Sequence, residues 1–90
     1  METSAIKRFM IINKQWAKVE DIMSLTGFGK SKSYQIINDI QKQILEGGKK
    51  NIARGVVPMD RLVEYLGINK IAVYKAAMQE KNIFGLGGTN

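Results

Sequence analysis

Basic and short polar side chains are concentrated between residues 30 and 54, and their chemistry suits binding rather than bond breaking. Six positive charges fall in these 25 residues against two negative ones, a local balance of +4 within a chain total of +6. The cationic residues are Lys30, Lys32, Lys42, Lys49, Lys50 and Arg54, and the short polar ones are Ser31, Ser33, Gln35 and Asn38. Lysine and arginine contact phosphates, whereas glutamine and asparagine can pair at two points with adenine. The set therefore favours contact with nucleic acid, although an ordinary solvated surface remains the alternative.

Side chains for catalysis or metal binding are scarce. The sequence contains no cysteine and no histidine, which excludes disulfides, thiolate metal sites and a histidine general base. The eight acidic residues are scattered and form no convincing carboxylate pair. The run GFGK at residues 27–30 lacks the spacing of a phosphate-binding loop and follows an expected helix rather than a strand. We therefore expect no enzyme, no metal, no cofactor and no small-molecule substrate.

Composition favours a small folded protein with a polyanionic partner. Fourteen lysines and arginines stand against eight acids in 90 residues, and 44% of the residues are hydrophobic. These values are ordinary for one folded domain, and nucleic acid is the commonest partner of a basic surface. No apolar run is long enough for a membrane span, and the stretch at residues 9–12 is too short for a signal-peptide core. We expect a cytoplasmic protein that does not enter the membrane.

Two helices joined at a glycine are expected to position the polar residues. Apolar spacing predicts the first helix over residues 18–25, with Glu20 and Asp21 in the turn where the helix dipole favours acids. Gly27 fits a left-handed cap followed by a tight turn, after which Phe28 should fold back onto the core. This layout is that of a helix-turn-helix, whose second helix enters the DNA major groove.

The second helix is expected over residues 31–46, with Ser31 or Gly29 as its N-cap. Helical spacing predicts a buried stripe made of Tyr34, Ile37, Ile40 or Gln41, Ile44 and Leu45. The opposite face should carry Lys32, Ser33, Gln35, Asn38, Asp39 and Lys42. If Ser31 only caps the helix and the lysines are only solvated, this face has no function in binding.

The N-terminal segment is expected to be a weak helix that leads to a core tryptophan. Thr3 or Ser4 can cap a helix over residues 3–15, although residues 9–12 fit a short strand equally well. Trp16, the only tryptophan, is expected to anchor the core because a large aromatic ring buries much area in a small domain. Base stacking is the alternative for this residue.

The segment after the second helix is expected to form a wing and two further helices. Residues 48–58 predict a small β-hairpin. Arg54 in this hairpin either contacts the minor groove or a phosphate of DNA, or is an exposed loop residue with no such contact. Residues 59–81 should form two helices, the first begun by Pro58 and closed by Gly67. The whole is predicted as a mainly α, single DNA-binding domain over residues 1–84, followed by a flexible tail over residues 85–90.

Four features in order connect this chain with a known group. They are the start of DIMSLTGFGKSKSYQIINDIQ, its serine-rich entry to the second helix, a basic wing, and a closing helix introduced by the VP of ARGVVPMDRLVEYLGI. Over residues 18–68 this pattern resembles the small winged helix-turn-helix proteins of phages and integrative elements, which include excisionases and excisionase-like regulators encoded near integrases. The resemblance implies that Lys30, Ser31, Lys32, Ser33 and Gln35 read the major groove, while Lys49, Lys50 and Arg54 contact the minor groove or phosphates. It also implies a recombination directionality factor or a transcriptional regulator of a mobile element.

Several alternatives stay open at the level of sequence. The expected partner is double-stranded DNA, joined by an integrase or a second copy of the chain. A small basic adaptor, or a replication accessory protein on single-stranded DNA, is the competing hypothesis, although the low aromatic content of 8% counts against base stacking. DIMSLTGFGKSKSYQII also resembles RLVEYLGINKIAVYKAA, either by duplication or because helix pairs joined at a glycine look alike. The apolar residues after Gly67 should pack on their own domain, with self-association as the alternative.

Overall fold

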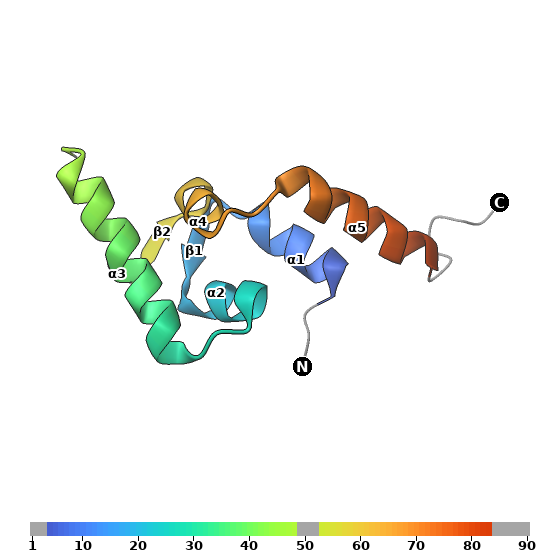
Figure 1. Ribbon diagram of the computed structural model, residues 1–90, viewed down its shortest axis with the longest axis horizontal. Helices are drawn as coiled ribbons and strands as arrows, with labels where there is room; N and C mark the ends of the chain where they lie inside the picture. The colour runs from blue at the N-terminus through green and yellow to red at the C-terminus, as the bar shows by residue number, and fades with distance from the viewer. Residues whose placement is uncertain (1–3, 49–52, 84–90) are drawn as a thin grey trace.

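The computed structural model describes residues 4–48 and 53–83, which fold as five helices and two short strands (Figure 1). In chain order these are α1 (Ala5–Ile12), β1 (Trp16–Lys18), α2 (Val19–Thr26), α3 (Lys30–Glu46), β2 (Val56–Pro58), α4 (Met59–Leu66) and α5 (Lys70–Ile83). The expected mainly helical fold class is confirmed, with one small antiparallel sheet. Within these residues no helix is both long and apolar enough to cross a bilayer.

Helix α1 confirms the helical alternative for the N-terminal segment and is fixed at its start by α5. Ser4 caps it by accepting a hydrogen bond from the Lys7 amide at 3.1 Å. The two carboxylate oxygens of Glu80 on α5 accept hydrogen bonds from the amides of Ala5 and Ile6 at 2.8 and 3.2 Å. These amides have no partner inside their own helix, so the Glu80 carboxylate satisfies them and also complements the dipole of α1. Helix α5 thus packs on its own chain, as expected, but Ile71, Tyr74 and Met78, which were expected to be buried by this packing, stay exposed. Thr3, the other expected cap, lies outside the described residues.

The largest fully buried side chains come from α2, α3, β2 and α4, so the core lies between these elements. Its main members are Ile22, Ile37, Ile40, Val57, Met59 and Leu62. Trp16 is not part of this core, because 48% of its surface is exposed. Residues in β1 alternate between outside and inside, so the neighbouring Ala17 is fully buried in its place. The expectation of a core tryptophan is therefore wrong.

β1 and β2 pair with each other although about forty residues separate them in the sequence. Trp16 lies opposite Pro58, Ala17 opposite Val57, and Lys18 opposite Val56, in an antiparallel register. Among the described residues the partner of β2 is β1, and the other arm of the hairpin expected within residues 48–58 lies mostly outside them. Burial gives the physical reason, since Ala17 and Val57 are both inaccessible to solvent and close one side of the core together. The expected flexible tail at residues 85–90 lies outside the described residues.

A strand–helix–glycine–helix unit occurs twice at a constant spacing of forty residues. β1 corresponds to β2, α2 to α4, and the start of α3 at Lys30 to the start of α5 at Lys70. Gly27 and Gly67 close the short helices with φ values of 79° and 70°, the left-handed conformation that glycine adopts without strain. Ala17 and Val57, which correspond in the two units, also pair with each other. The two strands are therefore related by an approximate local two-fold axis, and the constant spacing of the elements favours duplication over a chance likeness.

Candidate nucleic-acid interface

The turn before α3 is built from local hydrogen bonds that leave the start of α3 without a side-chain cap. The Thr26 hydroxyl donates to the Ile22 carbonyl at 2.6 Å and accepts from the Phe28 amide at 3.0 Å. Gly29 is the N-cap of α3 and has no side chain with which to satisfy the first amides. The Gly29 alternative is thus confirmed, and Ser31 lies exposed in the first turn. The start of such a helix attracts anions through its free amides and its dipole.

The surface of α3 opposite the core carries a straight row of hydrogen-bonding side chains. The row consists of Ser31, Gln35, Asn38 and Lys42, all exposed and spaced four, three and four residues apart. We call these four residues the α3 polar face. Lys30 and Lys32, also exposed, lie beside its beginning. This part of the expected solvent-facing surface is confirmed.

Ser33 does not belong to this face, and its assignment as a DNA contact is wrong. Its surface is completely buried, and its hydroxyl donates a hydrogen bond to the Gly29 carbonyl at 2.9 Å. Ser33 lies three and four residues before Ile36 and Ile37 and therefore on the same side of the helix. A serine there satisfies its hydroxyl within its own helix and helps to fix the first turn of α3.

The buried stripe of α3 is rotated relative to the expected one. It contains Ser33, Ile36, Ile37, Ile40 and Ile44. Tyr34 and Leu45, expected in the core, are 47% and 54% exposed. Tyr34 lies one helical turn from both Ser31 and Asn38 and so borders the α3 polar face. The aromatic ring of Tyr34 suggested burial. The sequence cue to the rotated stripe was Ile36, which the predicted stripe left out.

Two hydrogen bonds from Gln41, in the middle of α3, hold the turn that contains Arg54. The Gln41 side-chain amide donates hydrogen bonds to the carbonyls of Ala53 and Val56 at 3.1 and 3.0 Å. Arg54 and Gly55 lie between these two carbonyls, and Gly55 has a φ of 77°. Arg54 is exposed beside α3, whereas Lys49 and Lys50, the other expected wing contacts, lie outside the described residues. The sequence placed Gln41 on the apolar stripe only as an alternative to Ile40 and missed this anchoring role.

Two contacts organise the charges and the aromatic ring around α3. The Tyr65 hydroxyl on α4 donates a hydrogen bond to the Asp39 carboxylate at 2.9 Å. This hydrogen bond, helped by desolvation and by the negative charge of Asp39, raises the pKa of Tyr65 above its ordinary value near 10. Phe28, expected in the core, is instead 41% exposed, with the Lys32 ammonium 5.7 Å from its ring centre. This cation–π contact holds a basic residue at the edge of the interface.

The arrangement as a whole fits a polyanion. The α3 polar face offers hydrogen-bond donors and acceptors, and the cations Lys30, Lys32 and Arg54 lie around it. Among the residues the structure describes, no three acidic side chains gather as metal ligands. Comparisons of the chain with protein-family models, with curated proteins and with solved structures found no match.

Proposed function

We propose that this protein binds double-stranded DNA in a sequence-specific manner through α3, as a winged helix-turn-helix protein. The observation that carries the proposal is the α3 polar face, an exposed row of Ser31, Gln35, Asn38 and Lys42 with cations on both sides. A major groove about 12 Å wide admits one helix, and amide side chains on such a helix can read adenine at its groove edge. Ser33 is not included because it is buried.

Phosphate contacts in this proposal come from the cations around the row. Lys30 and Lys32 at the start of α3 meet one strand of the duplex, and Arg54 meets the backbone or the minor groove beside it. Gln41 supports this role because its two hydrogen bonds hold the Arg54 turn against α3. Tyr34 borders the row and offers an apolar surface to a thymine methyl group. We include Lys49 and Lys50 among the phosphate contacts because of their place in the sequence.

The biological role that we infer is that of a mobile-element protein, either a recombination directionality factor or a transcriptional regulator. Both roles need occupancy of short DNA sites, and the resemblance of residues 18–68 to excisionase-like proteins supports either. Footprinting over the DNA that flanks the gene separates them, because a directionality factor protects recombination sites whereas a regulator protects a promoter.

A binding assay with matched variants tests the proposal. Gln35→Ala should reduce the preference for the cognate duplex by about 1–3 kcal/mol, because it removes a base contact. Lys32→Ala should weaken binding to all duplexes about equally, because it removes a phosphate contact. Fluorescence anisotropy with cognate duplex, random duplex and single strand measures both effects. Single strand bound as tightly as duplex, or identical behaviour of the two variants, contradicts the proposal.

Protein contact is a second candidate function, favoured by exposed apolar side chains of α5. Ile71, Tyr74 and Met78 remain 66%, 48% and 41% exposed although α5 packs on α1. Ile71 and Met78 correspond in the repeat to Ser31 and Asn38 of the α3 polar face, so two polar positions of α3 are apolar in α5, whereas Tyr74 corresponds to Tyr34. Sedimentation at several concentrations, with and without duplex, tests whether copies associate through this surface. Ile71→Ser should then abolish association and leave the binding of a single copy unchanged.

A further inference from the structure

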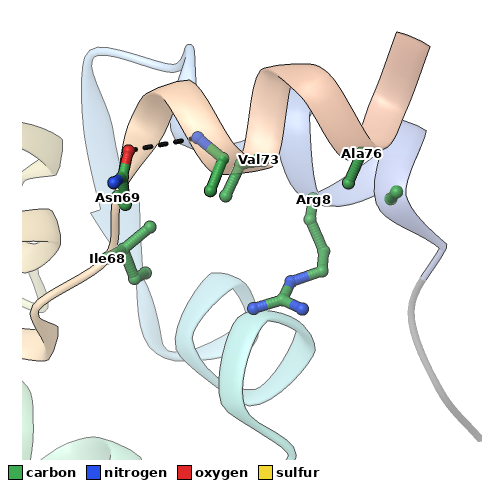
Figure 2. Close-up of a pocket in the computed structure, with 7 residues that line it drawn as sticks. Arg8, Ile68, Asn69, Val73 and Ala76 are labelled. Atoms are coloured by element: carbon green, nitrogen blue, oxygen red, sulfur yellow. Dashed lines mark hydrogen bonds between the residues drawn. The ribbon is translucent and has the colours of Figure 1, made fainter. Parts of the chain in front are cut away.

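A cavity of about 300 Å³ lies between α1, the α4–α5 turn and the first turns of α5. Five of its seven lining residues are apolar, namely Ala5, Ile68, Ala72, Val73 and Ala76. The polar ones are Arg8 and Asn69 (Figure 2). The Asn69 side-chain oxygen is engaged, since it accepts a hydrogen bond from the Ala72 amide at 3.1 Å. Arg8 therefore supplies the only charge among the seven lining residues.

One hydrogen-bond donor of Arg8 is left unsatisfied by the part of the chain that the structure describes. The Nε atom is buried, yet it has no hydrogen-bond partner within residues 4–48 and 53–83. The ion pairs found in these residues join Lys14 to Asp21 and Lys70 to Asp60. Glu80 on the neighbouring helix uses both oxygens to accept the α1 amides. A buried guanidinium donor without an acceptor is unfavourable, and such groups are normally satisfied by protein, water or ligand.

The unsatisfied atom defines the kind of acceptor that fits. The Nε–H and one Nη–H of an arginine form a planar fork that matches the two oxygens of a carboxylate. Because the Arg8 Nε is buried, a small rotation of the guanidinium must turn this fork into the cavity when a ligand binds. Figure 2 shows the Arg8 side chain running from α1 along one side of the opening, with Ile68 on the other side. The apolar residues around the fork suit an aliphatic stem, whereas a phosphate needs more donors than one arginine provides. The volume lies at the small end of the range for ligand sites.

We propose that this cavity binds a carboxylate on a short aliphatic stem. The fork of Arg8 holds the two oxygens, and the stem lies against Ile68, Val73 and the alanines. The same chemistry is offered by a free small acid and by a glutamate side chain of another molecule. The cavity lies at the α1–α5 end of the molecule, away from α3 (Figure 1), so its occupancy is separate from the proposed DNA contact.

Titration of the full chain with sodium butyrate, followed by amide and arginine Nε–H NMR signals, tests the proposal. At constant ionic strength, butyrate should cause saturable shifts of Arg8 Nε–H and of the amides at Ala5, Asn69 and Ala72. The expected Kd is on the order of 1 mM, as befits a ligand of few atoms. Butyramide, which has the same shape without the charge, should bind at least about tenfold more weakly. N-acetyl-glutamate methylamide distinguishes the two sources, because its tighter binding indicates a protein glutamate.

Two variants and a matched control make the result decisive. Arg8→Met should weaken butyrate binding by about tenfold or more, whereas Lys7→Met removes the same charge from an exposed neighbour and should leave it unchanged. Ala76→Leu fills the cavity, keeps Arg8 and should also abolish binding, which covers the case in which Arg8→Met fails to fold. The proposal is overturned if butyrate gives no saturable shift, if butyramide binds equally well, or if binding survives in Ala76→Leu.

Discussion

Ser33 and Gln35 are two residues apart on α3 and have opposite surroundings. The first is enclosed in the core and bonded to Gly29, and the second is in solvent on the α3 polar face. Their chemical similarity as short polar side chains concealed this difference in the sequence. Position relative to Ile36 and Ile37 decides the role of each residue, more than its polarity does.

Replacing these two side chains by valine should have unequal effects on stability. Ser33→Val adds volume to a fully packed site and removes a hydrogen bond, so we expect a loss of about 1–3 kcal/mol in the free energy of unfolding. Gln35→Val, an exposed change to the same residue, should stay within about 0.5 kcal/mol of wild type. Chemical denaturation followed by circular dichroism measures both. Equal stabilities would mean that the burial of Ser33 is incorrect.

The Tyr65–Asp39 hydrogen bond predicts a stability that declines in alkaline solution. The pKa of Tyr65 is raised in the folded protein, so the folded state favours the neutral phenol. This contribution is fully present below pH 10, the region of the unfolded pKa, and is lost as the pH rises through the higher folded value. Absorbance titration of the tyrosinate should show Tyr65 ionising above pH 10 in wild type and closer to it in Asp39→Asn. An unchanged titration in the variant would remove Asp39 as the cause.

At the scale of elements, helices were predictable and their long-range partners were not. Residues 18–25, 31–46 and 59–81 were expected as helices and fold as α2, α3, α4 and α5 within a few residues, because caps and apolar spacing act over one or two turns. The pairing of β1 with β2 depends on two residues forty positions apart, and three-residue strands have no periodicity of their own to reveal it. The α3 polar face was mostly predicted for the same local reason, whereas Gln41 and Tyr34 needed the tertiary structure.

The attachment of α5 to α1 can be tested at one carboxylate. Glu80→Ala leaves the amides of Ala5 and Ile6 without their acceptor, so we expect a loss of about 0.5–2 kcal/mol, the usual cost of removing a helix cap. Gln79→Ala, an exposed change on the next residue of α5, should be nearly neutral. Thermal unfolding of both variants gives the comparison. If Glu80→Ala is as stable as Gln79→Ala, the contact between the two helices does not depend on this carboxylate.

At the scale of the whole molecule, the proposed function depends on a surplus of positive charge that gathers near α3. DNA binding through these cations releases counterions, so the log–log slope of affinity against salt should be on the order of −4 to −6 for about five to seven neutralised phosphates. Lys30→Ala or Arg54→Ala should each reduce the slope by about one. Titrations of duplex at increasing salt provide the measurement. A flat salt response would count against DNA as the partner.

The pairing of Ala17 with Val57 also dictates an order in which the chain can fold. The backbone hydrogen bonds of α2 and α3 join residues that are close in the sequence. Neither strand, however, can form a sheet until its counterpart from the other unit has been made. On the ribosome, β1 is made first and has no partner until Pro58 has emerged, so the core that it closes is completed late. Bringing the two strands together closes a loop of about forty residues, at an entropic cost that grows slowly with length. Neither unit has a complete sheet when it is separated from the other, so we expect the two to gain and lose their structure together.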